Sequence, residues 1–446
     1  MNTPIYDFAR KYAESNAIRM HMPGHKGIPL LGCEPLDLTE ISGADELFAP
    51  DGIIAESERN ASGVFGCRTL YSTEGSSLCI RAMLYLILQY AAATGRKPVI
   101  AAGRNVHKTF LTAAALLRFE IIWLEQSPAA SYLTGGISES ALRKLRDAPD
   151  PPAAIWLTTP DYLGTLADIR HAAAFCHAHD MLLAVDGAHG AYLRFLEQSL
   201  HPVDLGADLC CTSAHKTLPV LTGGAYLHLA DRAPANLHEN AKAAMALFAT
   251  TSPSYLILES LDLCNQYLDG DFASDLSGCT AHLERIRQEL RQHGWTLCGD
   301  EPMKLTLRTK LCGYTGTELA EILQAHNIHV EFADPDYLVM MPSPQNTTAE
   351  LDAVCAVLCE IPQREAVTAE PPPIPQNHAQ AMPLSEVLSA PTESLPAAQC
   401  AGRICAAFSV SCPPAVPIVI CGERITEDAI RCMQYYGTET CRVVIE

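Results

Sequence analysis

The sequence predicts an α/β protein with a mostly parallel central sheet, followed by a smaller α+β domain. The first observation is that short apolar runs alternate with amphipathic helices from about residue 75 to residue 230, which is typical of βαβ units. The second is that this rhythm changes after Asp271, where a long helical pattern begins. The third is length, because 446 residues are too many for one compact core and indicate two or three domains.

The elements of the large domain follow from its apolar runs. Strands are predicted at residues 97–102, 120–124, 153–158, 181–186 and 208–212. Helices are predicted at residues 78–93, 108–118 and 169–179. In the smaller domain we expect helices at 282–292 and 318–326 and strands at 304–308 and 338–341. Residues 368–397 are rich in Pro, Ala, Ser and Glu without periodicity, as expected of a linker, and the last fifty residues resume an apolar pattern.

Composition excludes several classes of function. The 51 acidic and 31 basic side chains give a net charge of -20, which disfavours binding to nucleic acid or to an anionic membrane surface. The 18 cysteines are scattered without a CxxC pair, so we predict no metal site and interpret them as small apolar residues. The N-terminus lacks a long apolar run, and we expect no membrane span and a reducing cytoplasm.

Polar residues follow several predicted strands, where ligands collect in open α/β sheets. They are Asn105, His107, residues 159–162, Asp186, His189 and residues 213–216. The segment TEGSS, residues 73–77, precedes an apolar helix, so its amides and hydroxyls suit a phosphate, although the segment taken alone favours an ordinary serine N-cap.

Three further side chains suggest a flat, phosphorylated cofactor. Asp186 ends an apolar strand and could pair with a protonated pyridine nitrogen, or merely cap a helix or form a salt bridge. Lys216 in SAHK could form a Schiff base with an aldehyde, although solvated lysines are far commoner. His107 could stack on a ring or be an ordinary surface or capped histidine. Their convergence with the phosphate turn at successive strand ends favours the functional interpretation.

The motifs HMPGHK (21–26), DLTEISGADELFAP (37–50), RNVHK, DGAHG and SAHKTL together resemble the Orn/Lys/Arg decarboxylases, which are fold type I pyridoxal phosphate enzymes. The resemblance continues through TSPSYLILESLD (251–262) to AGRICAAFSVSCPPAVPIVICGERIT (401–426) and so spans nearly the whole chain. It implies decarboxylation of lysine, arginine or ornithine to the corresponding diamine or agmatine. HMPGHK and SAHK are the more specific motifs, because TEGSS and DGAH occur in many sheets.

The resemblance also assigns roles to residues. Lys216 is expected to form the internal aldimine with pyridoxal 5'-phosphate, Asp186 to pair with the pyridine nitrogen, and His107 to stack on the ring. His189 is expected beside the ring's phenolic oxygen or the aldimine. The remaining cofactor contacts are expected from Gly75, Ser76, Ser77, Ser213 and His215.

The family organisation implies an N-terminal arm that carries His21 and His25 across a dimer interface, with active sites shared between subunits. The expected divisions are an arm (1–60), a cofactor-binding large domain (61–270), a small α+β domain (271–367), the linker (368–397) and a C-terminal segment (398–446). The arm motif begins near residue 21, which resembles the short branch that lacks an N-terminal receiver-like domain.

Departures from the family pattern concern the substrate side of the site. Ser76 replaces the usual Thr, and the C-terminal YPPG pattern is CPPA at residues 412–415, in a region that helps form the substrate pocket. Glu423 and Asp336 are candidate acceptors for the substrate's distal cation, or solvated surface acids. Two alternatives stay open: another fold type I reaction, by an aminotransferase or a lyase, and a catalytically silent regulatory homologue.

Overall fold

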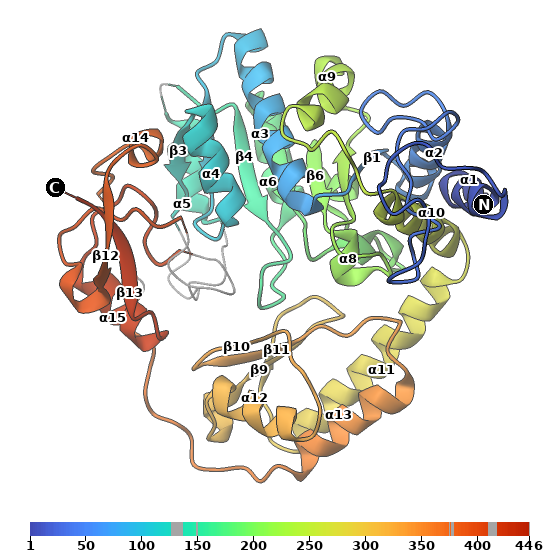
Figure 1. Cartoon of the computed structure of the whole chain (residues 1–446). Coiled ribbons are helices and arrows are strands. Elements are labelled where there is room, and N and C mark those ends of the chain that lie inside the picture. The colour runs from blue at the N-terminus through green and yellow to red at the C-terminus, as the bar shows by residue number, and fades with distance from the viewer. Residues whose placement is uncertain (126–136, 149, 374, 376–378, 409–416, 446) are drawn as a thin grey trace. The chain divides into compact units, whose positions relative to one another are not determined.

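The computed structural model describes residues 1–446 except 126–136, 149, 374, 376–378, 409–416 and 446. The chain divides into two compact units. The first comprises Met1–Pro98, Pro152–Trp156 and Asp168–Ser277, and the second comprises Val99–Pro151, Leu157–Ala167 and Gly278–Glu446. The helices and strands of each unit carry the labels of Figure 1.

The main sheet has seven strands in the order β1-β7-β6-β5-β4-β2-β3. Their bounds are β1 Arg68–Ser72, β2 Val99–Ala102, β3 Glu120–Trp123, β4 Ala154–Thr158, β5 Leu182–Asp186, β6 Leu209–Thr212 and β7 Ala225–Leu229. β5 pairs with β6 in parallel, as β2 does with β3, whereas β7 runs antiparallel to both of its neighbours. The five predicted strands are confirmed to within two residues at each end, and β1 and β7 were not predicted.

The first unit contains the long apolar helix α3, Gly75–Thr94, which ends at Gly95 in the left-handed conformation. The helix packs against β1, β5, β6, β7 and α9 (Ala235–Ala246). Its 20 residues are long and apolar enough to cross a membrane by length and composition, so the expectation that no segment has this length is wrong. Half of its most apolar window is buried in the fold.

The other helices of the first unit are α1 (Pro4–Glu14), α2 (Ile53–Phe65), α6 (Ile169–Ala178), α7 (Pro202–Leu205), α8 (Ala214–Thr217) and α10 (Tyr255–Asp269). The 3-10 turn η1 covers Ala191–Phe195, and α11 begins in this unit. Asp262 of α10 joins that helix to α1 and α2 along one buried seam. Its Oδ2 accepts hydrogen bonds from the backbone N–H groups of Ile5 and Tyr6 at the start of α1, and its Oδ1 accepts one from Ser57 of α2. The predicted N-terminal arm is therefore anchored at α1 and α2 to the motif that contains Asp262.

The second unit contains β2, β3, the helices α4 (Lys108–Leu117) and α5 (Glu139–Arg146), and a four-stranded sheet of order β10-β11-β9-β8. The sheet's strands are β8 Leu297–Cys298, β9 Leu305–Arg308, β10 Phe332–Ala333 and β11 Tyr337–Met340, and its helices are α11 Phe272–Gln292, α12 Gly316–Ala325 and α13 Thr348–Glu360, with η2 at Thr309–Cys312. The predicted helix at 282–292 is too short. Phe272, Leu276, Leu283 and Ile286 are all buried at helical spacing, but Ser, Thr and Gly residues between them obscure the period.

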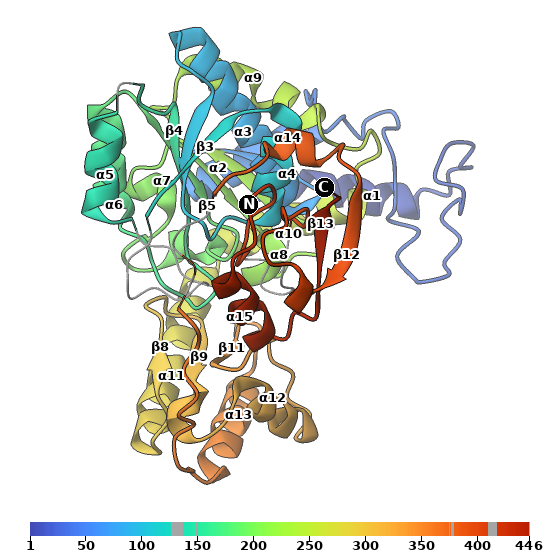
Figure 2. The same cartoon turned by 90° about the vertical axis from the view of Figure 1, so that its left-hand side faces the viewer.

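The C-terminal part contains α14 (Leu384–Val387), β12 (Thr392–Pro396), η3 (Ala397–Gln399), α15 (Glu427–Tyr435) and β13 (Thr440–Val444). β12 pairs antiparallel with β13, as Figure 2 shows, and buried residues such as Cys405, Val419 and Met433 form a core beneath. The prediction of a linker over 368–397 is therefore wrong for its last residues. The partner strand lies more than forty residues away in the chain, so no local period announces β12.

Candidate active site

The turns after β5 and β6 meet at the carboxyl ends of two adjacent parallel strands. Asp186, the last residue of β5, is in register with Cys211 of β6. The Gly187 N–H donates to the Cys211 carbonyl at 2.9 Å, and the Ser213 N–H donates to the Ala188 carbonyl at 3.3 Å. A Cβ at Gly187 would lie 3.2 Å from that same Cys211 oxygen, so the close approach favours glycine. DGAH and SAHK thus form one hydrogen-bonded structure, as their predicted positions at strand ends imply.

Lys216 lies in the short helix α8, and its Nζ is 3.1 Å from Nε2 of His189. His189 is buried, with 8% of its surface exposed, whereas Lys216 is exposed. One imidazole nitrogen and one primary amine therefore share a hydrogen bond at the edge of the sheet. Such a pair can hold a proton and pass it between the two groups.

Asp186 is buried, with 3% of its surface exposed. Its Oδ1 accepts a hydrogen bond from the Ala188 N–H at 3.2 Å and a weak one from the Cys211 thiol at 3.8 Å. Among the residues that the structure describes, no cationic side chain forms an ion pair with this carboxylate. Buried charges in proteins are normally paired, so the site fits a cationic ligand group such as a protonated ring nitrogen.

The segment TEGSS forms the N-terminus of α3, and its first helical residue, Gly75, has a φ of +67°. No side chain caps this end of the helix. Glu74 occupies the cap position, but its Oε1 accepts a hydrogen bond from the Thr250 N–H at 2.8 Å, so the carboxylate is engaged elsewhere. An uncapped helix N-terminus with hydroxyls beside it suits a phosphate dianion better than the simple serine N-cap that was the alternative.

One contact joins the TEGSS turn to the lysine turn, and a second joins it to the turn before β7. The Ser213 hydroxyl donates to the Ser76 hydroxyl at 2.9 Å, and the Gly75 N–H donates to the Gly223 carbonyl at 2.7 Å. His215 lies 2.9 Å through Nδ1 from the Gly224 carbonyl, which also accepts from the His215 backbone N–H. Gly223 and Gly224 were not singled out from the sequence, although a Gly-Gly pair before a strand is a signal for a close backbone approach.

His107 belongs to the second unit and is the N-cap of α4. Its Nδ1 accepts a hydrogen bond from the Thr109 N–H at 3.2 Å and lies 2.9 Å from the Thr109 hydroxyl oxygen. The capping alternative is therefore realised. The cap fixes the plane of the imidazole ring, which is also what a stacking residue requires.

Both candidate acceptors for the substrate's cation are already engaged. Glu423 is 1% exposed and forms a bidentate ion pair with Arg104, with N–O distances of 2.7 and 2.9 Å. Asp336 is 8% exposed, lies 2.8 Å from Lys310 Nζ, and accepts a hydrogen bond from the Tyr435 hydroxyl at 2.6 Å. Neither is a solvated acid, and neither carboxylate lacks a cation. The CPPA segment at 412–415 lies outside the described residues.

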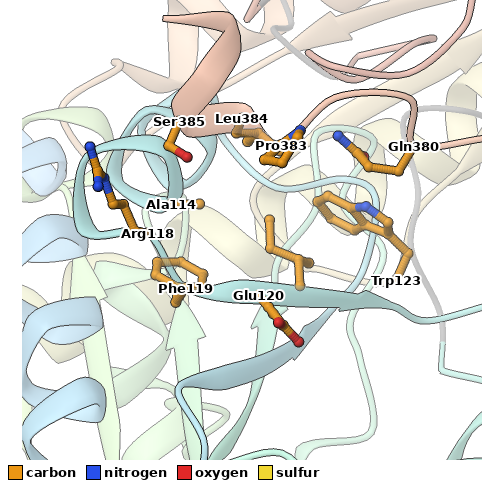
Figure 3. Close-up of a pocket in the computed structure, with 10 residues that line it drawn as sticks. Ala114, Arg118, Phe119, Glu120, Trp123, Gln380, Pro383, Leu384 and Ser385 are labelled. Carbon is orange, nitrogen blue, oxygen red and sulfur yellow. The ribbon is translucent and has the colours of Figure 1, made fainter.

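The second unit also contains a pocket of about 400 Å³ between α4, β3 and the start of α14 (Figure 3). It is lined by Ala114, Arg118, Phe119, Glu120, Ile121, Trp123, Gln380, Pro383, Leu384 and Ser385. None of these is a predicted site residue. This pocket therefore shares no residue with the turns that carry Asp186 and Lys216.

Comparison with known families gives matches in two regions. The sequence model of the Orn/Lys/Arg decarboxylase major domain matches residues 3–306, and that of the C-terminal domain matches residues 363–440. An arginine decarboxylase of Bacillus subtilis is 29% identical over 462 residues, covering 96% of this chain and 92% of the relative. An arginine decarboxylase of Halalkalibacterium halodurans is also 29% identical, with 95% and 91% covered.

Solved structures show the same architecture. The lysine decarboxylase of Francisella novicida matches with a TM-score of 0.80 at 18% sequence identity. The match covers 99% of this chain and 81% of the lysine decarboxylase chain. The constitutive lysine decarboxylase of Escherichia coli has a TM-score of 0.77 at 16% identity, with 100% and 82% covered. A NifS-like protein matches with a TM-score of 0.55. The predicted fold, of the fold type I class with a mostly parallel sheet and a smaller α+β domain, is confirmed.

Proposed function

The chain belongs to the Orn/Lys/Arg decarboxylase family, and we propose that the turns around Lys216 are where it decarboxylates a basic amino acid with pyridoxal 5'-phosphate. The observation that carries this proposal is the joining of three segments in one hydrogen-bonded structure. The buried carboxylate of Asp186, the amine of Lys216 and the uncapped end of α3 lie on turns linked by Gly187, Ser213 and backbone contacts.

The residues present fit the cofactor on each of its three chemical features. The amides and hydroxyls of Ser76 and Ser77 would hold the phosphate, with Ser213 behind them. Gly75, whose N–H donates to the Gly223 carbonyl, would contribute by shaping the turn. Lys216 would hold the aldehyde carbon covalently, and Asp186 would hold the ring nitrogen. When bound, the cofactor supplies an electron sink for the pair released as the carboxylate leaves.

Asp186 would act by keeping a proton on the ring nitrogen. Its buried negative charge stabilises a positive charge placed against it, and Oδ1 is held in position by the Ala188 N–H. Lys216 and His189 would move protons on the other side, because their nitrogens are 3.1 Å apart and one of them can return a proton to the substrate's α-carbon.

The substrate assignment rests on the relatives. Both of the similar curated proteins described above are named arginine decarboxylases, so arginine is the first substrate to test, followed by lysine and ornithine. We propose that His107 stacks on the cofactor ring and that a dimer shares its active sites through the arm. A cytoplasmic location and a role in polyamine synthesis accord with an amine product. We propose that the chain has the domains expected from its sequence, except that β12 belongs to the C-terminal segment.

The test compares Lys216→Ala with Lys97→Ala, an exposed lysine outside the site. Purified proteins are given cofactor and each amino acid, and carbon dioxide and amine are measured together. Reduction with borohydride followed by mass spectrometry reports covalent attachment separately. We expect Lys216→Ala alone to lose both turnover and attachment. Attachment with no carbon dioxide from any substrate would refute the decarboxylase, and attachment at another lysine would refute the site.

A further inference from the structure

Two cysteines and a glutamate of the small α+β domain converge between neighbouring helices. Cys355 and Cys359 are four residues apart on α13 and so lie on one face of that helix. Glu289 reaches them from α11, which runs beside α13 in Figure 1. The two sulfur atoms and a carboxylate oxygen all lie within 4.8 Å of one another.

Two contacts beside this cluster hold α13 to α11 and to the residues that follow α11. Towards the start of α13, His282 Nε2 lies 2.8 Å from Asp352 Oδ1. Towards its end, the Trp295 indole N–H donates to the Leu358 carbonyl at 2.9 Å. Glu289 lies between His282 and Trp295 in the chain. The three donor atoms are therefore brought together by contacts that do not depend on any ligand, as a pre-organised site requires.

The donor set is characteristic of a borderline-soft divalent cation. Thiolate sulfur selects zinc over magnesium or calcium, and zinc accepts mixed sulfur and carboxylate ligands in tetrahedral geometry. We propose that Glu289, Cys355 and Cys359 bind one Zn²⁺, with water in the fourth position, and that the ion clamps α11 to α13. The site is separate from the turns around Lys216 and does not depend on the proposed reaction.

The proton balance of the binding step is defined. Burial raises the pKa of the Cys355 thiol to about 12 and also raises the pKa of Cys359. Both cysteines bind zinc as thiolates, so each thiol gives up its proton in the binding step. Zinc binding forms two Zn–S bonds and one Zn–O bond and releases two protons. The apparent affinity should therefore rise with increasing pH.

The competing explanation is that the thiols are only small apolar residues, as the sequence suggested for the cysteines in general. Cys355 is 3% exposed and would pack equally well without a metal. The chain has 18 cysteines, so nonspecific binding must be separated from binding at this cluster. Cys279 on α11 and Cys298 on β8 give a matched control, because both are half-buried cysteines of the same unit outside the cluster.

The experiment uses the full chain, reduced with a phosphine and freed of metal by a chelator. Zinc is titrated against a chromophoric competitor, and cadmium is titrated while the ultraviolet thiolate-to-metal charge-transfer band is recorded. The variants are Cys355→Ser with Cys359→Ser, Glu289→Gln, and the control pair Cys279→Ser with Cys298→Ser. Far-ultraviolet circular dichroism reports folding, and Glu289 is exposed, so its substitution leaves a folded protein.

We expect wild type and the control pair to bind one high-affinity zinc. The Cys355/Cys359 pair should lose that equivalent and the cadmium band, and Glu289→Gln should lose at least about tenfold in affinity. The proposal is overturned if the cysteine pair binds zinc as wild type does. It is also overturned if Glu289→Gln leaves the affinity unchanged, or if wild type shows no high-affinity equivalent.

Discussion

His201 is a buried histidine whose replacement by phenylalanine should remove a pH dependence of stability. Neither ring nitrogen has a hydrogen-bond partner among the described residues, and none of its surface is exposed. The ring packs 4.8 Å from His228 and 6.0 Å from Phe65, centroid to centroid, so a second aromatic ring is compatible with the site. Burial lowers the pKa of His201 from 6.5 to about 4, against a smaller raising effect of Asp204.

The sign and size of the effect follow from this shift. The unfolded chain binds a proton near pH 6.5 and the folded chain only near pH 4, so stability falls as pH decreases through this window. Between pH 8 and pH 5 the loss of unfolding free energy is about 2 kcal/mol. His201→Phe should abolish that part of the loss. At pH 8 it should be no less stable than wild type, because two unpaired nitrogens leave the core.

Urea unfolding at pH 8 and pH 5 measures the effect, with His171→Phe on α6 as a control at an exposed histidine. The relevant quantity is the difference between the two pH values, compared between variant and wild type. We expect a reduction of about 2 kcal/mol in His201→Phe and none in the control. If wild type and His201→Phe lost the same unfolding free energy between pH 8 and pH 5, the reasoning would be refuted.

Three further predictions concern other buried charges. Asp186→Asn should keep the fold and lose most of the turnover, because an amide does not hold the ring nitrogen protonated; kcat near wild type would remove Asp186 from the mechanism. Burial, with the charges of Asp37 and Asp262, raises the pKa of Glu259 from 4.5 to about 8, so stability should fall as pH rises through this range. Glu259→Gln should recover on the order of 5 kcal/mol at pH 9 in urea unfolding, and an unchanged pH profile would contradict this. Arg104→Met should cost about 3 kcal/mol by removing the bidentate cation from the buried carboxylate of Glu423, and adding Glu423→Gln should recover part of it; additive losses would exclude coupling.

The strands that sequence analysis found and missed differ in where their signals lie. β5 reads as a strand because Leu182 to Val185 are all apolar, which is a local property. β1 and β7 contain Arg, Thr, Tyr and His, and so lack an apolar run. Their polar side chains are nevertheless satisfied across strands: His228 of β7 lies 3.0 Å from Thr69 Oγ1 and 2.9 Å from Thr212 Oγ1. Thr69 and His228 are more than 150 positions apart in the chain, so no local pattern reveals their contact.

The candidate site was predictable where a turn follows a strand and unpredictable where distant segments decide. Asp186, His189 and Lys216 were identified from strand ends, and the structure joins their turns as expected. The state of the phosphate turn could not be predicted, because it depends on Thr250 drawing the Glu74 carboxylate away from the start of α3. An acidic side chain at a helix N-terminus competes with an anionic ligand for the backbone N–H groups there. Here the fold removes this competition, because the Glu74 carboxylate is bonded to Thr250.

The contacts of Glu423 also depend on a residue far away in the chain. They bear on which carboxylate binds the distal cation of the substrate. Its motif presents an acid in a family segment, but its partner Arg104 lies 319 residues earlier and follows β2. A substrate guanidinium at Glu423 would have to displace an arginine that is bidentate and lies over the Trp123 ring, 5.6 Å from its centroid. That exchange would leave the Arg104 cation unpaired in a nearly buried position, at a cost that a second cation does not offset. Recognition of the substrate's distal cation is therefore expected from a carboxylate other than Glu423.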